Sequence, residues 1–435
     1  MKESGLAVEQ APPIWVPFRF FFTAPAFGVL AAGTLAWGGP DALASLYSPA
    51  TLAATHLLTL GFMAMVMLGA VMQIMPVVVG SPIPAPRLTA WCVHLPLAGG
   101  SLALSMGFVV DGTPLLRIGV ALLGFAFGAF IIAAAAGLAR APASSTTRNG
   151  LWLAVGGLAA TVVSGILLAS SRGWDIALPT FALTSLHPAW GLVGWTAILV
   201  IVIAYVVVPM FQMTRPYPLP MTRWFHPAIA ALLAVWSALA WNGVEGPMLN
   251  LPGYAVAASC LLFAVVTLKL QAGRRRRLPD VTLDFWRVAM ASLAAAAVLW
   301  TLRTLVPETV RPRADIVTGI LMIDGFAMSA ITGMLYKIVP FMAWFHLQAL
   351  NLGRGVAPNM KMIIPDKNAR RQFRLHVAAL AALLAAVALP EALVPMPEAW
   401  VQLAAILLAA AQGALLWNLI GAARLFRRYL LLQHG

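Results

Sequence analysis

The chain has 435 residues, of which 61% are hydrophobic and 10% charged, and its mean hydropathy is +0.88. This composition excludes a soluble globular protein and predicts a chain that lies mostly in a lipid bilayer. The formal net charge of +14 therefore indicates the sidedness of a membrane protein, and we expect no nucleic-acid partner.

Twelve apolar segments are long enough to cross a bilayer as helices. Because a spanning chain must satisfy its own backbone hydrogen bonds, we expect an all-α fold, with one transmembrane domain over residues 1–435. Helices 1 to 12 lie near residues 16–38, 51–78, 88–110, 115–139, 149–171, 184–211, 225–243, 252–271, 284–302, 316–345, 372–390 and 399–423.

The basic residues divide unequally between the two sides of this array. One side holds Arg117, Arg172, Arg303, Arg311 and Arg313, whereas Lys337 lies within helix 10 and all other Lys and Arg lie on the opposite side. The positive-inside rule then predicts that both termini are cytoplasmic, as an even number of spans requires. We expect a multi-pass protein of a bacterial-type inner membrane.

A Gly-aromatic pair followed by a proline recurs in helices 2, 6 and 10, and the proline comes fifteen residues after the glycine. The three copies are Gly61-Phe62 to Pro76, Gly194-Trp195 to Pro209, and Gly325-Phe326 to Pro340. A basic residue, an aromatic residue and a histidine follow each copy, the histidines being His94, His226 and His376. This recurrence predicts a pseudo-threefold repeat: helices 11–12 with 1–2, helices 3–6 (88–211) and helices 7–10 (225–345). We expect the three histidines to bond neighbouring helices.

Two histidines lie near the outer ends of the repeated helices. His56 and His187 precede their anchor glycines by five and seven residues, which places them within about 3 Å of each other in depth. Imidazole is the natural ligand of haem iron and of copper, so the pair suits axial haem ligation or a copper site. The alternative is that each ring bonds a backbone carbonyl at the membrane interface. The two-residue offset leaves open whether the rings face one cavity.

Other polar side chains within the spans are candidates for a proton or ion relay. They are Asp324, Lys337 and Gln73, and a polar group in hydrocarbon persists when it is partnered or functional. Asp324 and Lys337 lie about 20 Å apart along helix 10 and cannot pair. The structural alternatives are that Lys337 reaches the inner headgroups and that Asp324 bonds a neighbouring helix. The methionines of helix 2 could bind copper or simply pack: Met63, Met65, Met67, Met72 and Met75.

Signatures of several other protein classes are absent from the sequence. It contains no phosphate-binding glycine loop, no nucleophile elbow and no Cys-x-x-Cys-His motif. ATP-driven transport and covalently attached haem are therefore not expected. The two cysteines, Cys92 and Cys260, are too few for a disulfide framework or a thiolate metal site.

Twelve helices in three repeats, with histidines near the outer ends of helices 2 and 6, resemble the catalytic subunit of haem-copper oxidases and nitric oxide reductases. The sequence is more similar to the NnrS family. The opening VPFRFFFTAPAF (residues 16–27) resembles the NnrS start, and HLLTLGF (residues 56–62), with Gly69 and Pro76 after it, resembles its helix 2. The resemblance implies a haem-copper-oxidase-like fold and a bound haem b, with copper as a second candidate.

The chain departs from both patterns in its ligands. NnrS helix 2 carries a His-x-His, of which this chain keeps only His56, with Ala54 at the first position. The oxidase His-Pro-Glu of helix 6 reads His187-Pro188-Ala189, and the His-x-His of oxidase helix 10 is replaced by Thr318 and Ile320. The resemblance therefore implies one haem or one metal and argues against terminal oxidase or nitric oxide reductase activity.

Two functions follow as hypotheses. The first is an inner-membrane haem-binding protein that handles nitric oxide or electrons, with an electron donor or a small gaseous ligand as partner. In this case Arg303, Arg311 and Arg313 are candidates for the haem propionates, by charge complementarity alone. The second is a cofactor-free transporter or assembly factor that moves copper, protons or a small solute.

Overall fold

The computed structural model describes residues 12–142, 145–275, 278–350, 358–389 and 397–434, and these residues form helices without any strand. Twelve helices are long and apolar enough to cross a membrane, which confirms the multi-pass, all-α prediction. In chain order the elements are α1 (Trp15–Gly38), η2 (Gly39–Leu43), α2 (Pro49–His56), η3 (Leu57–Ala64), α3 (Met65–Val79), α4 (Pro86–Val109), α5 (Thr113–Arg140), α6 (Thr146–Trp174), α7 (Thr180–Ala189), η4 (Trp190–Ala197), α8 (Ile198–Gln212), α9 (Leu219–Trp241), α10 (Pro247–Ala272), α11 (Val281–Leu302), η5 (Arg303–Leu305), α12 (Arg311–Ile320), η6 (Leu321–Met328), α13 (Ser329–Leu350), α14 (Met360–Ile363), α15 (Asp366–Ala388) and α16 (Pro397–His434).

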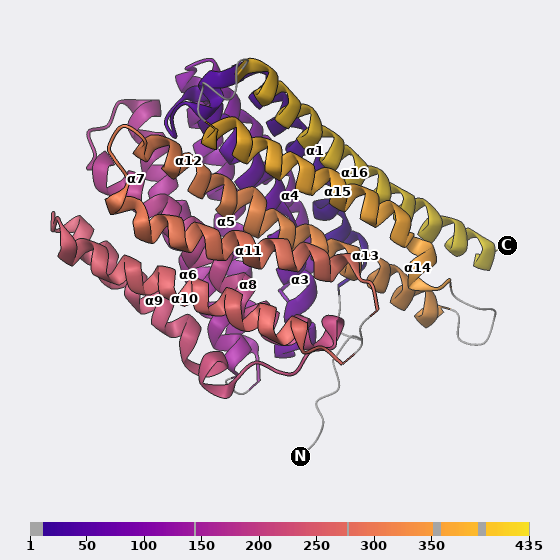
Figure 1. Ribbon diagram of the computed structural model, residues 1–435. Coiled ribbons are helices and arrows are strands. Elements are labelled where there is room, and N and C mark those ends of the chain that lie inside the picture. Colours follow the sequence, from indigo (N-terminus) through magenta and orange to yellow (C-terminus); the bar gives the residue numbers. More distant parts are fainter. Residues whose placement is uncertain (1–11, 143–144, 276–277, 351–357, 390–396, 435) are drawn as a thin grey trace.

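The three helices with the recurring glycine are the inner helices of the bundle. In each span we compare the burial of an apolar stretch of 18 residues. At least 61% of this stretch is buried in the spans α2–η3–α3, α7–η4–α8 and α12–η6–α13, against at most 50% in the other nine spans. In Figure 1, α3 and α8 lie between a flank that includes α15 and α16 and a flank that includes α9 and α10. The other spans thus form the lipid-facing wall around these three.

Each inner span contains a π-helical segment of eight residues, η3, η4 or η6, with the recurring glycine as its fifth residue. A π-helical turn widens the helix and is frequent at functional sites. Each segment packs against the span before it in the chain: η3 on α1, η4 on α6 and η6 on α11. The contact surfaces are small or flat, since Gly61 lies against Phe27, Gly157 against the Gly194 backbone and Gly325 against Ser292. Segment η6 also contacts both η3 and η4.

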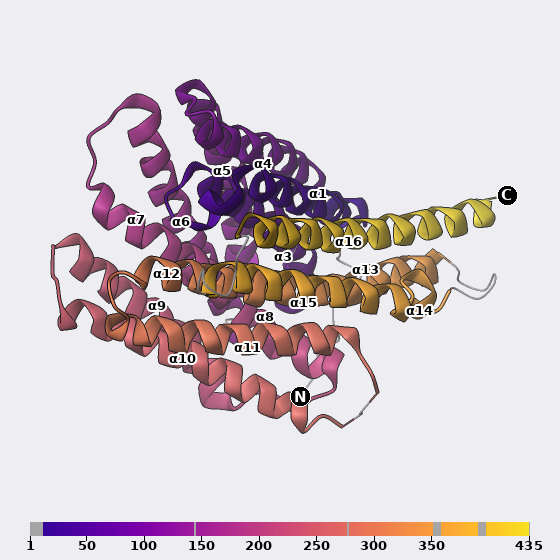
Figure 2. The same cartoon turned by 45° about the horizontal axis from the view of Figure 1, so that its top comes forward.

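The start of α1 and the end of α16 lie on the same side of the bundle. The Trp15 and Phe426 rings are 6.2 Å apart, and the Arg427 guanidinium lies 5.1 Å from the Trp15 ring centroid. We name this the basic side. Helix α16 has 38 residues, so its length of about 57 Å exceeds the roughly 30 Å of a hydrocarbon core. Both views show α15 and α16 running alongside each other (Figures 1 and 2).

Candidate functional site

His56 and His187 lie next to each other on the side opposite the basic side. Their ring centroids are 6.2 Å apart and their planes differ by 12°. His56 is the last residue of α2 and His187 lies in the last turn of α7, so each ring directly precedes a π-helical segment. Helical periodicity alone did not decide whether the two rings lie together, and in the structure they face one another.

Hydrogen bonds determine which nitrogen each ring offers. His56 Nδ1 lies 2.7 Å from the Leu52 carbonyl oxygen, and His187 Nδ1 lies 3.0 Å from the Thr161 carbonyl oxygen. A carbonyl can only accept, so in both rings Nδ1 carries the proton and donates it. Nε2 of each neutral imidazole is then left with a free lone pair. Metal-binding histidines have this same arrangement, in which the second nitrogen is held by a carbonyl.

Residues of α4 and α6 shape the walls around the pair. The Phe108 ring lies 5.2 Å from the His56 ring, and the Arg172 guanidinium lies 5.9 Å from the Phe108 ring centroid. On α6, Gly165 makes room for His187, because a β-carbon there would come within 2.7 Å of the His187 Cε1. Both histidines are partly buried.

The separation of the rings agrees with ligation of one metal by both histidines. Two imidazoles bound at about 2 Å on opposite sides of an ion place their centroids roughly 6 Å apart. Within the described residues no cluster of three or more His, Cys, Asp or Glu could hold a metal ion, so the pair is a two-nitrogen site. The methionines of the second span are buried core residues, and Met75 packs against Gly137 of α5.

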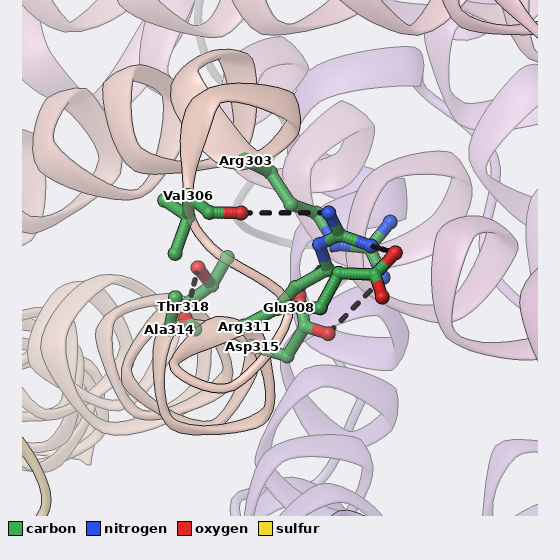
Figure 3. Close-up of polar contacts among 7 residues, drawn as sticks. All are labelled: Arg303, Val306, Glu308, Arg311, Ala314, Asp315 and Thr318. Atoms are coloured by element: carbon green, nitrogen blue, oxygen red, sulfur yellow. Dashed lines mark hydrogen bonds and ion pairs between the residues drawn. The ribbon is translucent and has the colours of Figure 1, made fainter.

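Two of the three candidate propionate-binding arginines, Arg303 and Arg311, form ion pairs within the chain (Figure 3). Arg303 binds Asp315 through two nitrogens, at 2.6 and 3.1 Å. Arg311 lies 3.6 Å from Glu308 and donates to the Val306 carbonyl oxygen at 3.4 Å. Arg313 is in the first turn of α12. Because Asp315 already neutralises Arg303, charge complementarity no longer favours a propionate role for this residue.

The relay candidates lie in different surroundings. Lys337 forms a 2.9 Å ion pair with Asp280, the N-cap of α11, so it has a structural partner at the basic side. Asp324 lies in η6 with 2% of its surface exposed, and neither carboxylate oxygen has a partner among the described residues. The buried Oε1 of Gln73 also lacks a described partner. Asp324 is therefore the member of this group whose burial needs explanation.

The recurring histidines bond neighbouring helices in two of the three units, as expected. His94 Nε2 lies 2.8 Å from Thr23 Oγ1 of α1, and His376 Nε2 lies 2.7 Å from Ser329 Oγ of α13. His226 packs against Tyr205, with ring centroids 6.3 Å apart. The sequence pattern does not indicate which buried polar residues accompany His376.

No model of a known protein family matches the chain, and no curated protein matches it either. The chemistry of the histidine pair must therefore be inferred from its own geometry.

Proposed function

We propose that this chain is a haem-binding membrane protein in which His56 and His187 are the two axial ligands, with a copper ion as the alternative metal. One observation carries the proposal: two nearly parallel imidazoles lie 6.2 Å apart, and both have Nδ1 held by a carbonyl. An interfacial histidine needs only its carbonyl bond. It does not need a second histidine at the separation that metal ligation requires.

The architecture supports a relationship to NnrS and to haem-copper oxidases. Three π-helical segments carry the glycine at the same position, in the second, sixth and tenth spans. This regularity supports a pseudo-threefold arrangement of the spans, which is the arrangement that the resemblance implies. The excess of Lys and Arg supports placing the basic side in the cytoplasm of a bacterial-type inner membrane.

The residues favour electron handling over reduction of a bound gas. A haem held by His56 and His187 would supply one-electron chemistry. The role of the protein is to orient both rings through the Leu52 and Thr161 carbonyls and to hold the site in apolar surroundings. An electron donor is then the partner to expect, whereas a nitric oxide ligand would have to compete with a histidine.

The test is the visible spectrum of detergent-purified protein, oxidised and dithionite-reduced, with iron and copper counted per chain. Wild type should contain close to one haem per chain, and His56→Ala and His187→Ala should each lose most of it. His346→Ala is the matched control, because His346 Nδ1 also bonds a carbonyl of its own helix, that of Met342, at 2.9 Å. This variant should keep the spectrum.

Other results have distinct meanings. One copper per chain without haem, lost in both variants, would identify the pair as a copper site. Colourless protein without iron or copper, produced with adequate haem supply, would contradict the proposal. The second hypothesis, a transporter or assembly factor, would then be preferred.

A further inference from the structure

A group of buried polar side chains lies where α13, α15 and α16 meet, away from the histidine pair. It consists of Ser329, Thr332 and Tyr336 on α13, Gln372 and His376 on α15, and Gln412 on α16, each at most 7% exposed. We name these six residues the polar column. Such a concentration is unusual in a chain with 10% charged residues, because a polar group in hydrocarbon is costly without a partner.

Hydrogen bonds of four members of the column, Ser329, Tyr336, Gln372 and His376, join the three helices at successive depths. Asn418 of α16 donates to the Tyr336 hydroxyl at 2.9 Å. Gln372 Nε2 donates to the Ala411 carbonyl of α16 at 3.3 Å, and His376 meets Ser329 at 2.7 Å. Seven residues of helix separate Tyr336 from Ser329, which corresponds to about 10 Å of depth. The column is therefore elongated along the membrane normal.

The outer end of the column reaches the backbone of Asp324. The Ser329 hydroxyl lies 3.3 Å from the backbone carbonyl oxygen of Asp324, which can only accept. Ser329 therefore donates to this backbone carbonyl and accepts from His376, so His376 carries its proton on Nε2. The Asp324 carboxyl lies on the same residue and has no partner among the described residues. The total depth from Tyr336 to Asp324 is about 18 Å. Asp324 lies in η6, the segment that contacts both η3 and η4.

The other end of the column lies close to water. Gln372 is two residues after Arg370, whose side chain is 37% exposed and pairs with Asp284 at 3.1 Å. Two residues of helix amount to about 3 Å of depth. Water at the basic side thus lies within a turn of Gln372.

Many polar atoms of the column have no partner among the described residues. They are Thr332 Oγ1, Gln372 Oε1, His376 Nδ1 and both amide atoms of Gln412, together with both carboxylate oxygens of Asp324. If the column served only to hold helices together, its side chains would need only the bonds they already make. Gln412 makes no such bond, although its side chain packs directly against Gly28 of α1. Buried polar atoms of this kind bind ordered water.

The charged groups on the elements around Asp324 are paired with one another or exposed. Segments η3 and η4 contain no ionisable residue. Asp315 of α12 is paired with Arg303, Lys337 of α13 with Asp280, and Asp284 of α11 with Arg370. Arg287 of α11 is exposed. From α15, His376 bonds Ser329, which donates to the backbone carbonyl of Asp324.

We propose that the polar column is a hydrated proton path that connects the basic side of the membrane with Asp324. Hydroxyl, imidazole and amide groups bridged by water pass protons, and buried carboxyl groups are the usual terminus of such relays. The path lies outside the spans of His56 and His187, so it does not depend on the metal-binding proposal.

The test is infrared spectroscopy of the protein in lipid, with transfer from H₂O to D₂O. Wild type should show a carboxylic-acid C=O band that Asp324→Asn removes, and this band should shift within the time of water exchange. Thr332→Val and Gln412→Met, which remove polar atoms at similar volume, should slow the shift at least tenfold. Thr196→Val is the control, because Thr196 is equally buried but bonds the Gly191 carbonyl within the sixth span.

Two outcomes would overturn the path. One is the absence of any carboxyl band that depends on Asp324 at every pH at which the protein stays folded. The other is an exchange rate in both column variants equal to that of wild type. Thermal unfolding of each variant identifies a variant that fails to fold. One column variant that folds is enough for the test. The exchange can be measured in protein with or without haem or copper, so failure of the metal site and failure of the path are distinguishable.

Discussion

At His56 and His187 a single hydrogen bond decides the chemistry of each ring. The Leu52 and Thr161 carbonyls bind the Nδ1 protons and so direct both Nε2 lone pairs away from the backbone. His56 uses a carbonyl of its own helix, whereas His187 uses one from α6. The position of His187 therefore depends on how closely α6 approaches α7.

Gly165 provides a test of this dependence. A β-carbon at Gly165 would come within 2.7 Å of His187 Cε1, so Gly165→Ala should displace the ring without removing a ligand. We expect metal or haem affinity to fall about tenfold or more, as for other residues that orient a metal-binding histidine. Haem or metal content per chain, measured during titration, checks this expectation.

Gly156→Ala is the matched control, because Gly156 lies on the same helix and a β-carbon there would have no neighbouring atom within 4 Å. It should retain wild-type affinity. Equal affinity in the two variants would show that α6 does not position His187.

At the scale of elements, the π-helical segments determine how closely the inner spans approach their neighbours. Gly157 of α6 packs against the backbone of η4 at Gly194, where no side chain can move aside. We expect Gly157→Ala to lower the free energy of unfolding by about 3 kcal/mol, at the upper end of overpacking effects. The adjacent Gly156→Ala should be neutral or should stabilise the helix by up to about 1 kcal/mol.

Thermal or denaturant unfolding in detergent measures both variants. If Gly157→Ala were as stable as wild type, the close contact between α6 and η4 would be excluded. The comparison is direct because the two glycines are neighbours on one helix and differ in what they face.

Ion pairs at the helix ends explain two residues that the sequence marks as functional candidates. Lys337 binds Asp280 and Arg303 binds Asp315, each between adjacent elements of the third unit. Partly exposed pairs of this kind contribute little to stability, about 0 to 1 kcal/mol each. They satisfy the charges of their residues and leave Asp324 as the buried carboxyl without a partner among the described residues.

For the whole molecule, the sidedness of the membrane can be tested directly. The start of α1 and the end of α16 share the basic side, and the excess of positive charge predicts that this side is cytoplasmic. A fluorescent protein fused after α16 should therefore fluoresce. A periplasmic phosphatase inserted after Gly246, between α9 and α10, should be active. The reverse pair of results would invert the membrane orientation and place the histidine pair on the cytoplasmic side.

The sequence by itself determined the twelve spans, because hydropathy reports which residues can lie in lipid and a spanning backbone must be helical. It also determined the similar depth of His56 and His187, since the rise per residue of a helix is constant. The recurring glycines indicated the three inner spans, although not their π-helical form.

Only the tertiary structure decided which side chains meet. The rotation of one helix about its axis relative to another depends on side-chain packing, and periodicity within one helix does not report it. His56 and His187 face each other because Gly165 and the carbonyl of Thr161 position one ring beside the other. The polar column likewise joins residues from positions 329 to 412, whose proximity follows from the packing of α13, α15 and α16.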